Sequence, residues 1–262
     1  MNTFYIQKED YQLFAKQIYF NKNNQAKPTL VFLHDSWGCE EMWGDFPEKL
    51  VKLSGLDALI YDRRGYGKSS PFAITQRDEF YLHHEAKQLI EVLDSCRIEN
   101  AIVYGHSDGA TIALIAAAIN PTRFDGLILE GPHSFIEDSG KAAVRATRER
   151  AKETNLIASL EKFHGEKTGE LFRLWHETWL SDYFSKWSIV SILNQITCPV
   201  LAFQGENDDF GSIEQLNILK ETIANKVTIA EIPNAGHTPR KEAMEQTTEL
   251  IWNWFITQNK NI

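Results

Sequence analysis

The chain has 262 residues and a formal net charge of −9, so it is long enough for one large domain with a buried core or for two small domains, and we expect one. The acidic balance and the absence of a Lys/Arg block argue against nucleic-acid binding, which needs a basic face, and leave a small molecule as the expected partner. Cys39, Cys96 and Cys198 lie far apart and form no Cys-x-x-Cys pair, which predicts free thiols rather than disulfides or a zinc site.

Short apolar runs alternate with helical stretches along the chain. Continuous apolar runs are typical of strands buried in a parallel sheet, and they occur at residues 30–34, 58–62, 101–104, 127–129, 200–203 and 227–229. Amphipathic or Ala-rich stretches between and after them predict helices at residues 86–93, 110–119, 213–223 and 242–255. The alternation predicts an α/β fold with a doubly wound, mostly parallel sheet.

Residues 137–192 break this alternation. They are charged, helical in pattern and rich in tryptophan, with no convincing strand. We therefore expect a helical lid inserted into a core that consists of residues 1–136 and 193–262. Aromatic side chains in the lid would give a substrate cavity an apolar roof, as expected for an acyl or aromatic substrate. The candidates are Phe172, Trp175, Trp179 and Trp187.

No segment predicts export or membrane insertion. Residues 1–10 lack an apolar signal-peptide core, and the longest nearly apolar run, residues 110–119, is much shorter than the roughly 20 residues that span a bilayer. We therefore expect a cytoplasmic protein that makes no membrane contact.

Residues 105–109 read Gly-His-Ser-Asp-Gly and join a strand-like run to an Ala-rich helical run. A serine in such a strand-to-helix turn is held in a strained conformation that exposes its hydroxyl above the sheet. The small residues on either side let the strand and helix backbones approach each other. Ser107 is therefore a candidate nucleophile, and the alternative is a serine in an ordinary Gly-rich turn.

A nucleophilic serine needs a histidine to accept its proton and a carboxylate to fix the tautomer of that histidine. Asp208 follows the apolar run at residues 200–203, and His237 follows the next strand-like run. Both residues are thereby predicted at the edge where parallel strands end and catalytic groups gather. Asp209, adjacent to Asp208, and Glu130, at the end of the preceding strand, are alternative acids.

These motifs, with two further segments, resemble the α/β-hydrolase superfamily over about residues 28–256. Residues 34–38 (His-Asp-Ser-Trp-Gly) resemble the family's His-Gly oxyanion loop, and residues 62–69 resemble its Asp-x-Arg-Gly-x-Gly-x-Ser turn. The serine, the acid and the histidine also occur in the family's chain order. The family spacing Gly-x-x-Asp favours Asp208 as the acid.

The resemblance implies an oxyanion hole made of two backbone N–H groups, those of Ser36 and of Asp108, which would stabilise a tetrahedral intermediate. The chain departs from the family at Asp35, where glycine is usual. Because a carboxylate facing the oxyanion would be unfavourable, we expect the Asp35 side chain to point away. This departure, with residues 81–86 and 131–133, resembles a bacterial subgroup of α/β-fold hydrolases that have a short helical lid.

We therefore expect a serine hydrolase that cleaves a small carboxylic ester, thioester or lactone through an acyl-enzyme on Ser107, with carboxylesterase as the safest label. Two alternatives stay open. One is a C–C bond hydrolase of diketone-type acids, which an arginine placed for a substrate carboxylate would favour, and the other is a ligand receptor with slow turnover. Dehalogenases and epoxide hydrolases are disfavoured, because those relatives carry an aspartate at the elbow in place of Ser107.

Three further histidines are assigned, one as a substrate contact and two as structural residues. His133 is expected near the substrate, His106 packed against neighbouring strands, and His34 bonded to loop backbone. No pair of histidines shows metal-ligand spacing with a carboxylate, so we expect neither a metal nor a cofactor. A homodimer stays open.

Overall fold

Eight strands form a single sheet in the computed structural model, which describes residues 1–20, 28–223 and 227–259. Their order is β1-β2-β4-β3-β5-β6-β7-β8; the six strands from β4 onward run parallel, and β2 pairs antiparallel with β1 and with β4. The predicted doubly wound, mostly parallel α/β sheet is confirmed. The strands are β1 (Asn2–Gln7), β2 (Gln12–Ile18), β3 (Thr29–Leu33), β4 (Ala58–Tyr61), β5 (Ala101–His106), β6 (Phe124–Glu130), β7 (Val200–Gly205) and β8 (Val227–Ile232).

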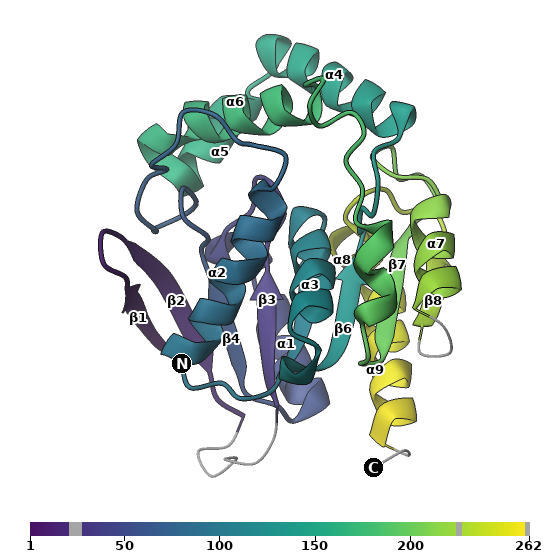
Figure 1. Cartoon of the computed structure of the whole chain (residues 1–262). Coiled ribbons are helices and arrows are strands. Elements are labelled where there is room, and N and C mark those ends of the chain that lie inside the picture. The colour runs from purple at the N-terminus through teal and green to yellow at the C-terminus, as the bar shows by residue number, and fades with distance from the viewer. Residues whose placement is uncertain (21–27, 224–226, 260–262) are drawn as a thin grey trace.

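Helices cover both faces of this sheet (Figure 1). Strand residues point alternately to the two faces, so Val31 and Leu33 pack with α2, α3 and α7, whereas Leu30 and Phe32 pack with α1 and α9. Two apolar cores result, and each strand of the centre is buried from both sides. The described helices are α1 (Phe46–Ser54), α2 (Tyr81–Ser95), α3 (Asp108–Ile119), α4 (Asp138–Glu153), α5 (Leu156–His164), α6 (Thr168–Trp179), α7 (Glu214–Thr222), α8 (Pro239–Glu242) and α9 (Met244–Asn259).

The hairpin β1–β2 and helix α1 were not predicted from the sequence. In β1 only Ile6 is buried, so this edge strand shows no apolar run and no clean alternation. Helix α1 begins with Pro47 in its first turn and ends at Gly55, which has a left-handed φ of 69°. The residues that start and end a helix are thus present, but the helix between them has only nine residues and gives a short amphipathic pattern.

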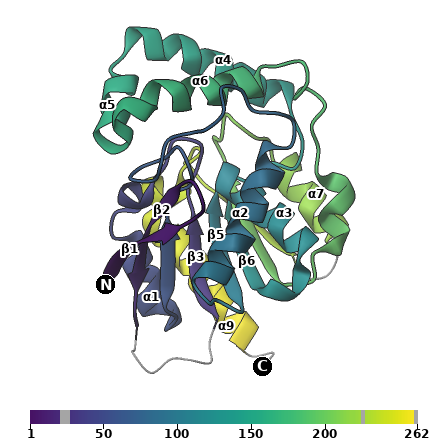
Figure 2. The ribbon, with the colours of Figure 1, turned by 60° about the vertical axis from the view of Figure 1, so that its left-hand side comes forward.

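Helices α4, α5 and α6, which we call the cap helices, lie beyond the carboxyl ends of the parallel strands (Figures 1 and 2). The described residues of the predicted lid form no strand, and their one bridge joins Ser188 to Phe135. The division into a core and a lid of residues 137–192 stays a prediction. Among the described helices, none is long and apolar enough to cross a bilayer.

Candidate active site

Ser107 lies in the turn between β5 and α3. Its backbone has φ 55° and ψ −118°, a conformation that is unfavourable for any residue with a side chain. The Ser107 N–H donates to the Glu130 carbonyl at 2.8 Å, which ties the turn to β6. The turn also needs two glycines: a Cβ on Gly105 would collide with the Gly109 backbone, and a Cβ on Gly109 would collide with the Leu33 carbonyl. The strained turn is therefore fixed by its surroundings, as the sequence predicted.

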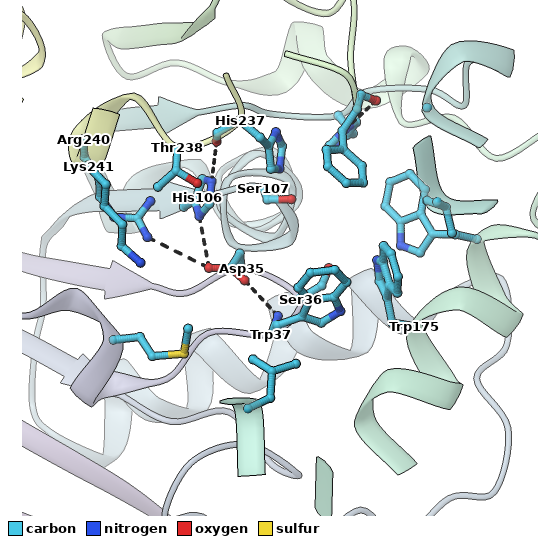
Figure 3. Close-up of a pocket in the computed structure, with 17 residues that line it drawn as sticks. Asp35, Ser36, Trp37, His106, Ser107, Trp175, His237, Thr238, Arg240 and Lys241 are labelled. Carbon is cyan, nitrogen blue, oxygen red and sulfur yellow. Dashed lines mark hydrogen bonds and ion pairs between the residues drawn. The ribbon is translucent and has the colours of Figure 1, made fainter. Parts of the chain in front are cut away.

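His237 and Asp208 meet at the same edge of the sheet. His237 Nδ1 lies 2.8 Å from Asp208 Oδ2 and 2.9 Å from Asp208 Oδ1. The Phe210 N–H donates to Asp208 Oδ1 at 2.9 Å and holds the carboxylate in place. Asp209 is exposed to solvent. Figure 3 shows Ser107 beside the His237 imidazole, so the nucleophile, histidine and acid predicted from the sequence come together.

The charges at this edge favour an ionised acid and a basic histidine. Burial opposes ionisation of Asp208, but the imidazole of His237 outweighs it and lowers the pKa of the carboxyl group. Burial likewise opposes the imidazolium form of His237, but the Asp208 carboxylate outweighs it and raises the pKa of the imidazole. With Nδ1 donating to Asp208, the Nε2 atom of neutral His237 is free to accept a proton.

The two predicted oxyanion donors lie at the ends of neighbouring elements. Ser36 follows β3, is buried and lines the pocket described below. Asp108 is the first residue of α3, and the N–H of a first helical residue has no acceptor within the helix. The Asp108 carboxylate contacts the Tyr81 hydroxyl at 3.4 Å and does not line the pocket. Ser36 thus shares the pocket with Ser107, and Asp108 directly follows Ser107 in the chain; their role as main-chain donors stays a prediction.

A pocket of about 240 Å³ lies over Ser107. The candidate nucleophile, His237, Ser36 and Trp37 form part of its wall. Its roof is apolar and comes from all three cap helices. The roof residues are Gly140 and Val144 of α4, Leu160 of α5, and Trp175 and Trp179 of α6.

Two of the expected roof residues do not line the pocket. Trp187 instead stacks on Phe184 with ring centroids 5.1 Å apart, and Phe172 packs against Trp37 and Trp175. His106 was expected to pack among the strands but lines the pocket, and Asp35 lines it as well, with its carboxylate directed at His106. Asp35 Oδ2 lies 3.1 Å from His106 Nδ1, a contact between residues 71 positions apart that no local pattern reveals.

The other two histidines match their predicted surroundings. His34 contacts loop backbone, with Nδ1 2.8 Å from the Asp35 carbonyl and Nε2 accepting the Arg63 N–H at 3.1 Å. His133 lines the pocket, and its Nε2 lies 3.2 Å from the Phe210 carbonyl. Its buried Nδ1 has no hydrogen-bond partner within the described part of the chain and can accept a donor from a substrate.

Two aromatic pocket residues, Trp37 and Phe210, were missed, as were Arg240 and Lys241. Trp37 directly follows Ser36 and stands at right angles to Trp175, with ring centroids 4.5 Å apart. Phe210 lies beside His237, with ring centroids 4.8 Å apart. Trp37 lies in the loop after β3 and Phe210 in the loop after β7, close in sequence to candidate catalytic residues. This position, at the carboxyl ends of parallel strands, is the sequence signal that could have identified them. Across the residues that the structure describes, no group of three His, Cys, Asp or Glu side chains is arranged to hold a metal ion.

Comparison with known proteins assigns the family. The model of the alpha/beta hydrolase family matches residues 30–250. The chain belongs to the alpha/beta hydrolase family. The matched span contains Ser36, residues 105–109, Asp208 and His237.

Individual relatives of this hydrolase are distant. The human serine hydrolase BPHL is 23% identical over 201 residues, which cover 73% of this chain and 67% of that protein. The 2-hydroxy-6-oxononadienedioate/2-hydroxy-6-oxononatrienedioate hydrolase 2 of Pseudomonas putida is 25% identical over 266 residues, with 91% of each chain covered. A solved carboxylesterase structure from Nitrososphaera gargenis superimposes with a TM-score of 0.79 at 16% identity and covers 98% of this chain and 100% of that one.

The first prediction for this hydrolase concerns pH. Because a proton-accepting His237 must be neutral, kcat/KM should be lost as the pH falls through the pKa of the imidazole. The Asp208 carboxylate raises that pKa, so the acid limb should lie above the ordinary histidine value of about 6.5. A pH–rate profile on a neutral ester measures it, and a limb below the ordinary value would contradict the arrangement.

The second prediction concerns the roof. Replacing Trp175 with alanine should lower kcat/KM for hexanoyl esters by about tenfold to 200-fold, the range for a changed apolar pocket, and should affect acetyl esters less. Trp187→Ala is the matched control, because it removes another buried tryptophan that does not line the pocket. Equal changes in acyl preference in the two variants would contradict a roof at Trp175.

Proposed function

We propose that the protein is a serine hydrolase that cleaves a small carboxylic ester, thioester or lactone through an acyl-enzyme on Ser107. The observation that carries this proposal is the strained Ser107 turn in the same pocket as the hydrogen-bonded His237–Asp208 pair. Strain of this kind persists only where the surrounding structure enforces it, and here it presents a hydroxyl next to an imidazole.

The chemistry follows from these positions. The Ser107 hydroxyl attacks the acyl carbon while His237 Nε2 takes its proton, and the carbonyl oxygen becomes an oxyanion. The N–H groups of Ser36 and Asp108 stabilise that charge, where loss of one donor costs about 3 kcal/mol in a comparable enzyme. Collapse of the intermediate transfers the proton to the leaving alcohol and leaves the acyl group on Ser107.

The second half of the cycle regenerates the enzyme. His237 removes a proton from water, the resulting hydroxide attacks the acyl-enzyme carbonyl, and Ser107 leaves as the alcohol with that proton. Asp208 holds Nδ1 of the imidazole throughout, so that Nε2 faces the reacting atoms. The pocket size of about 240 Å³ supports a small acyl group.

The names of the relatives point in more than one direction, and the elbow residue helps to choose between them. Epoxide hydrolase B of Mycobacterium tuberculosis is 31% identical, but over 107 residues that cover 40% of this chain and 29% of that protein. A serine at the elbow supports an ester-type reaction over those that need an aspartate there. The carboxylesterase of Nitrososphaera gargenis, whose fold this chain shares, is consistent with that preference.

A panel of 4-nitrophenyl esters from acetate to octanoate tests the proposal, together with labelling by a fluorophosphonate. We expect a burst followed by steady turnover and covalent labelling of Ser107. Labelling without steady turnover would indicate a slow ligand receptor. The absence of both labelling and turnover would overturn the proposed reaction.

One observation favours a second candidate, a C–C bond hydrolase of diketone-type acids. Arg240 and Lys241 line the pocket opposite Trp175 (Figure 3). Arg240 Nη1 is bonded to the Glu130 carboxylate at 2.6 Å. The ammonium group of Lys241 makes no hydrogen bond or ion pair with any described residue, so it is available to a substrate carboxylate, as the dienedioate named for the Pseudomonas putida relative would carry.

Replacing Lys241 with methionine tests this candidate. In this variant KM for 4-nitrophenyl hydrogen glutarate should rise, and KM for 4-nitrophenyl valerate should stay unchanged, because only the glutarate ester carries a free carboxylate. Lys241→Arg, which keeps the charge, is the matched control. If wild type hydrolyses neither the glutarate ester nor 2-hydroxy-6-oxononadienedioate faster than neutral esters, the second candidate is wrong.

A further inference from the structure

Two pocket side chains outside the Ser107–His237–Asp208 set connect the loop after β3 to the backbone of His237. His106, the last residue of β5, has Nδ1 3.1 Å from Asp35 Oδ2 and Nε2 2.8 Å from the His237 carbonyl oxygen. Figure 3 shows this chain of contacts running along the wall of the pocket beside Ser107. His106 is buried, and the Asp35 side chain is 21% exposed, so solvent does not replace these contacts.

His106 lies between two oxygen-bearing partners. A carbonyl oxygen can only accept, so His106 Nε2 donates to His237. On the other side of the ring, Nδ1 faces the Asp35 carboxyl group, whose Oδ1 accepts the Trp37 N–H at 2.8 Å. Despite burial, the contacts with His106 and Arg240 hold the pKa of the Asp35 carboxyl group well below its ordinary range. The Nε2–H bond is therefore the contact through which His106 reaches the loop that carries His237.

Charged groups face His106 from every side. Asp35 approaches from the loop after β3, and the His237 ring lies with its centroid 5.1 Å away. Glu130, at the end of β6, is bonded to Arg240 at 2.6 Å and to the Tyr104 hydroxyl at 2.9 Å. Arg240 Nη2 lies 4.0 Å from Asp35 Oδ2, at the limit of an ion pair. Of these carboxylates, Asp35 is thus the one in direct contact with the His106 ring.

The loop that carries His237 is held from two directions. Glu242 accepts the N–H groups on either side of this residue, from Gly236 at 2.6 Å and from Thr238 at 3.0 Å. His106 Nε2 donates to the His237 carbonyl, on the other side of the same stretch of backbone. Removal of the His106 bond leaves the His237 carbonyl without this donor, so that the peptide between His237 and Thr238 is held by Glu242 alone.

We infer that Asp35 and His106 form a positioning pair that fixes the His237 backbone, and through it the proton-accepting imidazole. The inference rests on the proposed function, since positioning is expressed in turnover. It assigns a use to Asp35, the residue by which the chain departs from the family it resembles. Neither residue touches the reacting atoms in this scheme.

Two substitutions of His106 separate its bonds. The amide nitrogen of glutamine takes the place of Nε2 in His106→Gln and keeps a donor for His237, whereas that of asparagine takes the place of Nδ1 in His106→Asn and keeps only the Asp35 contact. We expect kcat per active site, counted from the burst amplitude, to fall about tenfold in H106N and less than about threefold in H106Q. KM should change in neither variant.

The pH profile tests the Asp35 side of the pair. The Asp35 carboxylate is one of the groups that raise the pKa of His237, so Asp35→Asn should move the acid limb of kcat/KM downward. H106N and H106Q keep this carboxylate, and their acid limbs should stay close to that of wild type.

Equal losses of kcat in H106N and H106Q would overturn the inference and leave His106 a packing residue. Wild-type protein without esterase turnover would instead overturn the proposed function. Should the variants fail to fold, nitrogen-15 NMR of the histidine side chains in wild type decides: we expect the His106 imidazole to carry a proton on Nε2, bonded to the His237 carbonyl, and its absence would overturn the pair.

Discussion

Ser107→Ala is expected to abolish ester turnover and to leave the fold intact. The hydroxyl faces the pocket over the sheet, so its removal deletes the nucleophile without opening a cavity in either apolar core. In a comparable triad enzyme, loss of the nucleophile lowers kcat by about 10⁶-fold. The backbone strain at Ser107 is unchanged, because alanine carries the same Cβ. Ester kinetics measure the loss of turnover, and circular dichroism and thermal unfolding measure whether the fold is intact.

Ser95→Ala provides the control, because Ser95 is an exposed serine at the end of α2, the end remote from the pocket. It should retain wild-type kcat and KM and should not affect fluorophosphonate labelling. A Ser107→Ala protein that keeps more than a small fraction of the wild-type rate would show that another group attacks the ester, and the proposed reaction would be wrong.

The parts of the fold that the sequence predicted are those where burial on both faces produces uniform apolar runs. Strand β5 is buried at every position, and α3 is apolar on nearly all sides, so each stood out. The hairpin β1–β2 was missed because β1 exposes most of its residues and pairs at an edge of the sheet. Its strand character comes from pairing with β2, which no local pattern encodes.

A similar division holds for the site. Ser107, Asp208 and His237 each follow a strand, so a one-dimensional pattern sufficed to place them at one edge. The positions of Asp35 and Trp187 depend on how distant segments pack. Asp35 turns toward His106 only because β3 and β5 lie next to each other in the sheet. Which tryptophans of residues 137–192 line the pocket could not be predicted before the packing of that segment was known.

Asp208→Asn should also be severely damaging, although less so than loss of the nucleophile or of His237. Asparagine can still accept the Phe210 N–H at Oδ1, but its amide then offers a donor to His237 Nδ1 where the carboxylate offered an acceptor. The imidazole must take the opposite tautomer, with its proton on Nε2, and can no longer accept the proton of Ser107. A substitution of this kind lowers kcat by about 10⁴-fold in a comparable triad with little change in geometry.

Asp209→Asn is the matched control, since it makes the same chemical change one residue along on an exposed side chain. Its kcat and KM should stay within about twofold of wild type, because surface changes away from a site have small effects. The comparison also tests the choice of acid made from the spacing in the sequence. If Asp209→Asn lowers kcat more than Asp208→Asn does, the contact between His237 and Asp208 is not the one that orients the catalytic imidazole.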